Sequence, residues 1–124
     1  MRRAGLVVAE ALEACRLAVA SGVTTGDLDR IAAEVIAQAG AEPSFLGYHG
    51  FPATICTSVN DEVVHGIPGP RQLRSGDVIS IDCGAIVDGW HGDAAITVGV
   101  GTIAAELQEL SAVTRSAMWD GICA

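Results

Sequence analysis

The chain has 124 residues, of which half are apolar and only 4% aromatic, so that Ala, Val, Ile and Leu supply most of a buried core, a composition that argues against disorder. Fifteen acidic residues stand against seven basic ones, all of them arginine, and the formal net charge of −8 argues against a nucleic-acid surface or an anionic membrane as partner. No stretch approaches the roughly 18 uninterrupted apolar residues that a membrane span needs.

Two amphipathic helices are predicted at the start of the chain. Apolar residues recur at steps of three and four through residues 1–21, which is typical of a helix with one buried face. No Ser, Thr, Asp or Asn precedes this helix to accept its first N–H groups, so we expect the natural chain to begin further upstream. A turn follows, and Thr24 or Thr25 can cap a second helix over 27–39, which Gly40 closes.

The middle of the chain changes to strand-forming sequence. From Glu42 onward glycine, proline and aromatic residues are frequent, and short β-branched runs then predict strands. These runs cover residues 55–59, 63–65, 78–83 and 94–100. The order of the elements predicts an α+β fold, an antiparallel sheet with helices on one face.

A third helix is predicted from Gly101 to the last residue. Its apolar residues fall mostly on one side, and they are Ile103, Leu107, Leu110, Val113 and Met118. This pattern places the helix, with Glu106 and Glu109, on the outer face of the sheet. No C-cap or proline follows it, so we expect the natural chain to continue beyond Ala124.

Four cysteines are spread widely over the chain, at Cys15, Cys56, Cys83 and Cys123. They form no CxxC pair and no zinc-finger spacing, and reduced thiols in the cytoplasm fit this pattern better than the alternative of two disulfides. Charged residues also interrupt the apolar start of the chain, which argues against a secretory signal peptide. The sequence therefore predicts a cytoplasmic protein.

A hairpin brings two aspartates onto one face of the predicted sheet. If Asp88 and Gly89 form its turn, counting back along both strands places Asp82 opposite Ala95. Asp93 is two residues from Ala95 and lies on the same face, so the two aspartates are diagonal neighbours roughly 7 Å apart at the backbone.

Two neighbouring carboxylates in an apolar sheet repel each other and need either a shared proton or a cation. Hard oxygen ligands at this spacing suit one or two divalent metal ions. The alternative is that Asp82 is a hydrogen-bonded strand residue and Asp93 a surface residue near the turn.

Among the three histidines, His65 has the most informative context. Apolar residues on both sides predict that it enters a buried surface, where Gly66 and Pro68 turn the chain. His49 and His91 are each followed by glycine, which suggests loop positions. The alternative for all three is an ordinary polar role without a ligand or a reaction.

Two long motifs resemble type I methionine aminopeptidases. They are SFLGYHGFPATICTSVNDEVVHGIP (44–68) and SGDVISIDCGAIVDGWHGDAAIT (75–97), and the resemblance extends outward over essentially the whole chain. It implies a pita-bread fold, of which residues 1–124 would form the first half as a single incomplete domain.

The resemblance also implies a site for two divalent metal ions, discussed for the family as cobalt, manganese, iron or zinc. Five side chains hold these ions in the family: two aspartates on a hairpin, then a histidine and two glutamates from the later half. Asp82 matches the first aspartate and Asp93 the second. The remaining three ligands have no match here, and we expect a C-terminal half to supply them.

The substrate contacts implied by the resemblance lie in the first motif. His65 matches the family histidine that contacts the substrate beside the scissile peptide and stabilises the tetrahedral intermediate, a catalytic role. Tyr48, Phe51 and Cys56 fall where the family builds its methionine pocket, with Phe45 adjacent. Packing in the core is the alternative role for Phe45.

The implied reaction is removal of the initiator methionine from nascent polypeptides by a metal-activated water. We expect the 124 residues to be inactive alone, because their ligand set is incomplete. A catalytically silent metal-binding or partner-binding module of the same fold is one alternative. A relative of the Xaa-Pro peptidases is another, although the GYHGFP and HGIP segments favour the methionine aminopeptidases.

Overall fold

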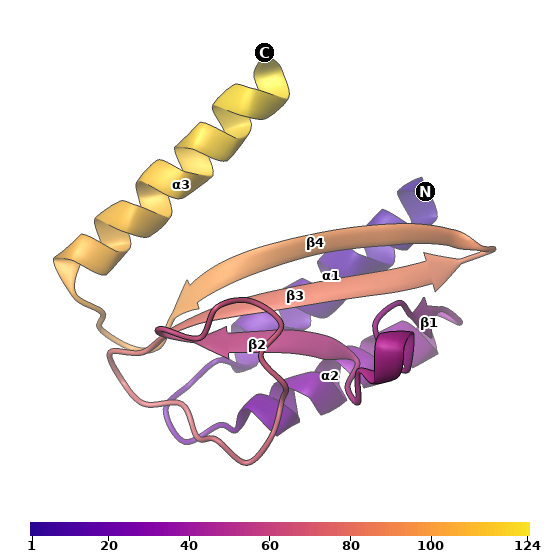
Figure 1. Cartoon of the computed structure of the whole chain (residues 1–124), viewed down its shortest axis with the longest axis horizontal. Coiled ribbons are helices and arrows are strands. Elements are labelled where there is room, and N and C mark those ends of the chain that lie inside the picture. The colour runs from indigo at the N-terminus through magenta and orange to yellow at the C-terminus, as the bar shows by residue number, and fades with distance from the viewer.

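The computed structural model describes all 124 residues as a four-stranded antiparallel sheet with two helices against one face and a third helix projecting away (Figure 1). Its elements in chain order are α1 (Arg2–Ala18), α2 (Thr25–Gln38), β1 (Glu42–Pro43), the 3₁₀ turn η1 (Tyr48–Gly50), β2 (Ile55–Val59), β3 (Val78–Val87), β4 (Trp90–Gly99) and α3 (Ala105–Cys123). The predicted α+β class and the helices on one face are therefore confirmed.

The first two helices form where their sequence pattern predicts them. The second begins with a capping box, in which the Thr24 side chain accepts from the Asp27 N–H and the Asp27 carboxylate accepts from the Thr24 N–H. These bonds satisfy N–H groups that the start of a helix otherwise leaves without partners. Each helix buries one stripe, which comprises Ala4, Val8, Ala11, Leu12 and Cys15 on α1 and Thr25, Leu28, Ala32 and Ile36 on α2.

β3 is the centre of the sheet. It pairs with β4 along its whole length on one side, and on the other side with β2 and the short β1. Asp88 and Gly89 form the turn between β3 and β4, with positive φ angles of 52° and 77° that suit a tight hairpin. Both hairpin strands are longer than the predicted 78–83 and 94–100, because pairing continues to the turn.

The core lies between the sheet and the two helices. Side chains alternate between the faces of a strand, and Ile79, Ile81, Cys83 and Ala85 of β3 all point toward the helices and are fully buried. Gly92 of β4 gives α1 close access, since a Cβ there would lie 2.6 Å from the α1 backbone. Burial of each large apolar side chain stabilises the fold by roughly 1.5–3 kcal/mol.

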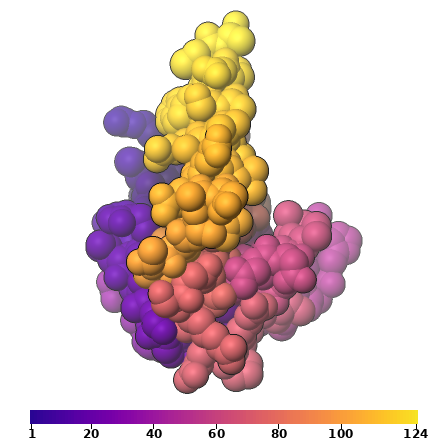
Figure 2. Space-filling model, turned by 90° about the vertical axis from the view of Figure 1, so that its left-hand side faces the viewer, coloured from indigo at the N-terminus to yellow at the C-terminus, as the bar shows by residue number.

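The third helix forms, but it does not cover the sheet as predicted. None of its residues is buried, and Figures 1 and 2 show it leaving the end of β4 and projecting from the body of the molecule. Glu106 and Glu109 therefore do not lie on the outer face of the sheet. The prediction was wrong because an apolar stripe shows which side of a helix seeks a partner without showing where that partner lies.

None of the three α-helices has both the length and the apolar character that crossing a membrane requires.

Candidate metal and substrate site

The predicted aspartate pair lies on the face of the sheet that the helices leave bare. Asp82 pairs with Ala95 and Gly84 pairs with Asp93, which confirms the register predicted from the turn. Successive residues of a strand alternate in direction, so Asp82 and Asp93 share this face as diagonal neighbours. The Asp82 side chain is half-buried and that of Asp93 is exposed.

The environment of Asp82 disfavours a lone negative charge. Burial raises the pKa of this carboxyl above its ordinary value, the charge of Asp93 raises it further, and His65 partly opposes both. Asp82 Oδ1 is buried and has no hydrogen-bond donor. This oxygen therefore calls for a proton or a cation.

Two carboxylates are a suitable but partial set of metal ligands. Their hard oxygens are the donors that divalent ions prefer, and the orphaned Oδ1 has the chemistry of a ligand atom. No group of three or more His, Cys, Asp or Glu side chains in this chain is arranged to hold a metal ion. Four or more ligands are usual for a divalent ion, so the pair fits a metal as part of a larger set.

His65 lies in the loop between β2 and β3 and not in a strand. The predicted strand over 63–65 and the buried surface for His65 were both wrong, since Val63, Val64 and His65 are exposed. Val64 and His65 have positive φ angles of 28° and 53°, which a pleated strand does not allow. The charge of the His65 imidazole nevertheless favours the ionised form of Asp82 and lowers the pKa of that carboxyl.

The predicted pocket residues come from two elements, the strand β2 and the segment around η1. Cys56 of β2 pairs directly with Asp82 and is buried, and burial together with the charges of Asp82 and Asp93 raises the pKa of its thiol to about 11. Tyr48 is 68% exposed on η1 and stacks edge-to-face on His49, which also lies in this short turn. Phe51 is half-buried immediately after it. The thiol is therefore neutral, and the two aromatic side chains belong to a separate segment around η1.

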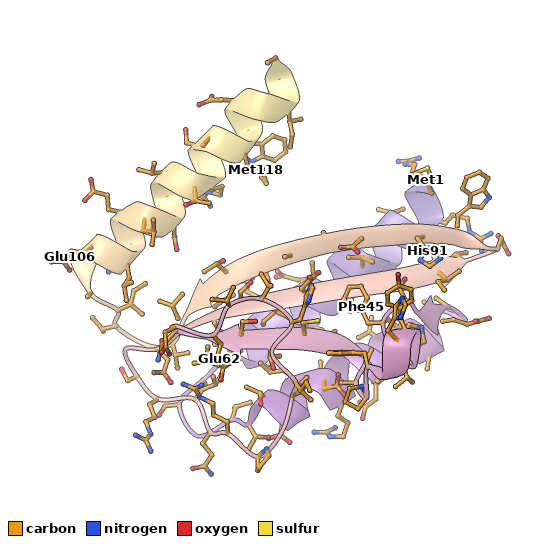
Figure 3. The ribbon with its side chains drawn as sticks, in the orientation of Figure 1. Met1, Phe45, Glu62, His91, Glu106 and Met118 are labelled. Carbon is orange, nitrogen blue, oxygen red and sulfur yellow. The ribbon has the colours of Figure 1, made fainter.

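Two residues of this face were missed by the sequence reasoning. His91, predicted in a loop, is the second residue of β4, and its Nδ1 lies 3.0 Å from the Ser44 hydroxyl. Gly84 faces Phe45, and a Cβ at Gly84 would lie 2.8 Å from Phe45 Cε1 (Figure 3). Two signals could have found them: His91 precedes Asp93 by two residues, and a glycine inside a strand often marks a close approach.

Similarity to known proteins agrees with this geometry. The sequence model of metallopeptidase family M24 matches residues 1–124. The chain belongs to metallopeptidase family M24. Membership in this family carries dependence on a divalent metal, in agreement with the donor chemistry of the aspartate pair.

Relatives within family M24 are named methionine aminopeptidases. Methionine aminopeptidase 1 of Mycobacterium tuberculosis is 57% identical over 125 residues, which cover 100% of this chain and 47% of that protein. The crystal structure of methionine aminopeptidase from Rickettsia prowazekii superposes with a TM-score of 0.95 at 41% identity, over 98% of this chain and 49% of that one. This confirms the predicted first half of a pita-bread fold. The chain spans about half the length of the relatives it matches.

The Xaa-Pro peptidases share the fold but are more distant. Prolidase from Pyrococcus furiosus superposes with a TM-score of 0.75 at 20% identity, over 86% of this chain and 30% of that one. A likeness at this identity concerns the fold alone. The comparison therefore favours the methionine aminopeptidases over the Xaa-Pro alternative.

Proposed function

We propose that this chain carries the first half of the active site of a methionine aminopeptidase, which removes the N-terminal methionine from nascent polypeptides. The observation that carries the proposal is the Asp82 and Asp93 pair on the bare face, with an oxygen that has no donor. The 57% identity to a methionine aminopeptidase supports the substrate class. Nascent polypeptides as substrate place the reaction in the cytoplasm.

Two divalent ions, drawn from cobalt, manganese, iron and zinc, are the proposed cofactors, and Asp82 and Asp93 would hold them from this side. When bound, the ions would supply the positive charge that activates a water molecule and polarises the scissile carbonyl. A histidine and two glutamates outside these 124 residues would complete the ligand set. The two carboxylates alone provide too few donors for a closed site.

His65 is the proposed group that acts on the substrate. The charge of its imidazole favours the ionised form of Asp82, which supports a place for His65 near the metal ions and the peptide carbonyl that they would polarise. It could donate a hydrogen bond to the oxygen that becomes negative during the attack of water. This role requires an accessible side chain, and His65 is exposed.

The methionine side chain is proposed to bind between the β2 edge and the segment around η1. Cys56 contributes a neutral, polarisable thiol next to Asp82, and Tyr48, Phe51 and Phe45 contribute aromatic surface. Sulfur and aromatic groups suit a thioether. The seat of Phe45 on Gly84, directly opposite Asp93, would place this surface next to the metal ligands.

Metal titration tests the aspartate assignment. Calorimetry with Mn²⁺ alone should show weak binding to the unaltered chain and a loss of at least about ten-fold in affinity in Asp82→Asn and in Asp93→Asn, as expected when one of few ligands is removed. Asp88→Asn is the matched control, because Asp88 is an exposed carboxylate in the turn of the same hairpin. Equal binding of Mn²⁺ by the unaltered chain, Asp82→Asn and Asp93→Asn would contradict the assignment.

A peptide assay tests whether these 124 residues hold only part of the active site. With Mn²⁺ or Co²⁺, the 124 residues should not hydrolyse Met-Ala-Ser, whereas a longer polypeptide that joins them to the remaining ligands should. Turnover by the 124 residues alone would refute the proposed half site. Metal binding without turnover by the longer polypeptide would instead support a silent module of the same fold.

A further inference from the structure

The loop that carries His65 is tied to the sheet and to its own far end by one carboxylate, that of Glu62. Glu62 Oε2 accepts a hydrogen bond from the Val59 N–H at the end of β2, with a distance of 2.8 Å. Glu62 Oε1 accepts from Nη1 of Arg71, which lies later in the same loop. Figure 3 labels Glu62 in the loop, near the end of β2. A single side chain therefore joins the two sides of the loop.

A second tie fixes the loop directly after His65. The Gly66 N–H donates to Ser58 Oγ at 3.1 Å, and the Gly66 carbonyl accepts from the Thr57 N–H at 2.8 Å. Gly66 is pressed between two groups, since a Cβ there would lie 2.1 Å from the Thr57 carbonyl oxygen and 3.2 Å from Glu62 Oε2. The Glu62 carboxylate therefore lies close to Gly66.

Val64 and His65 lie between the two ties in a strained conformation. Their φ angles of 28° and 53° fall in the left-handed region, and Val64 is β-branched, so its side chain resists this backbone. Neither side chain is buried, so packing against the body does not impose the conformation. Strained residues keep such angles only where the surrounding bonds determine them.

We propose that Glu62, together with Arg71, is a positioning residue that fixes the backbone conformation of His65 and thereby the placement of its imidazole. The proposal rests on the proposed function only for the importance of His65 in the reaction. The ion pair is about 40% exposed on each side, and pairs of this kind contribute little to the stability of a fold. The role that the geometry assigns to this pair is therefore local: it fixes the backbone on either side of Val64 and His65.

Nuclear magnetic resonance of the metal-free chain tests the tie itself. A positive φ brings a residue's own N–H and Hα close together, which gives a strong intraresidue nuclear Overhauser effect. In Glu62→Ala this signal at Val64 and His65 should fall at least about two-fold relative to the sequential signal, because the strained angles relax. Glu62→Gln keeps an acceptor for the Val59 N–H and should show a smaller fall. Signals unchanged in Glu62→Ala would overturn the proposal.

Two further variants separate positioning from folding. Glu13→Ala breaks an ion pair with Arg16 that has similar exposure but lies on α1, and it should leave the signals of Val64 and His65 unchanged. Arg71→Ala removes one tie of Glu62 and leaves the Val59 bond, so it gives a readout if Glu62→Ala does not fold. If the intraresidue signals of Val64 and His65 are unchanged in Arg71→Ala, the proposed role of Arg71 is wrong.

Activity of the longer polypeptide that completes the ligand set separates this proposal from the proposed function. Glu62→Gln should lower kcat about ten-fold with little change in KM, and should lower it no further in a His65→Ala background, because its effect passes through His65. An equal loss in both backgrounds would overturn the positioning role. If His65→Ala has no effect on kcat, the proposed function of His65 fails while the magnetic resonance result on Glu62 stands.

Discussion

The two faces of the sheet differ in what surrounds their side chains. Ile81 of β3 is fully buried against the helices, whereas its neighbour Asp82 points to the bare face and has a buried oxygen without a donor. Because side chains alternate along a strand, a shift of one residue separates the part that stabilises the fold from the part that carries the chemistry. The helix-covered face stabilises the fold. The bare face carries the Asp82 and Asp93 carboxylates, whose negative charges destabilise it in the absence of a cation.

The largest effect should come from the helix-covered face. Ile81→Ala should lower the free energy of unfolding by about 2–5 kcal/mol, because it removes buried methyl groups and leaves a cavity in the core. Urea denaturation followed by circular dichroism measures the change. Thr97→Ala, at an exposed position of the bare face, should change it by less than about 0.5 kcal/mol. Similar losses for the two variants would show that the faces do not differ in this way.

A smaller loss is expected where the bare face is locally crowded. Gly84→Ala should lower the free energy of unfolding by about 1–3 kcal/mol, because the new methyl group would lie 2.8 Å from both Phe45 Cε1 and Ser44 Cβ. The same substitution should shift the resonances of the Phe45 ring. Gly5→Ala is the control, since a Cβ at this helical glycine meets nothing within 4 Å and should stabilise the chain slightly. An undisturbed Phe45 ring in Gly84→Ala would show that Gly84 is not its seat.

Neutralising the bare face should raise stability. In the metal-free chain Asp82→Asn should increase the free energy of unfolding by about 1 kcal/mol at neutral pH, because a half-buried charge beside Asp93 disappears. The folded state raises the pKa of Asp82, so the penalty grows as pH rises from the ordinary value of 3.8 toward the folded value. The advantage of Asp82→Asn should therefore shrink on acidification below this window. If Asp82→Asn is less stable than the unaltered chain at neutral pH, the Asp82 charge does not destabilise the metal-free fold.

The sequence was sufficient to predict the paired strands and the pair of aspartates. A tight turn at Asp88 and Gly89 fixes the register of both strands, and the register fixes which face Asp82 and Asp93 share. The capped start of α2 was readable for the same reason, because Thr24 and the turn chemistry act over a few residues. Local rules were enough wherever the deciding contacts are local.

Contacts that no apolar pattern encodes explain the errors. The apolar run at Val63 and Val64 resembles a strand, but side-chain bonds of Glu62 and Ser58 hold it in a loop with positive φ angles. The contact between Ser44 and His91 joins residues 47 positions apart, and no local pattern announces it. The influence of His65 on the pKa of Asp82 likewise joins residues 17 positions apart.

The smallest effect should come from α3, which belongs to neither face. Met118 is 51% exposed and no residue of α3 is buried, so Met118→Ala should change the free energy of unfolding of this chain by less than about 0.5 kcal/mol. Urea denaturation at two protein concentrations measures this, and Ile81→Ala is the contrast. A loss above about 1 kcal/mol at both concentrations would mean that α3 packs on the body of the molecule. A loss that appears only at the higher concentration would mean that it packs on a second copy.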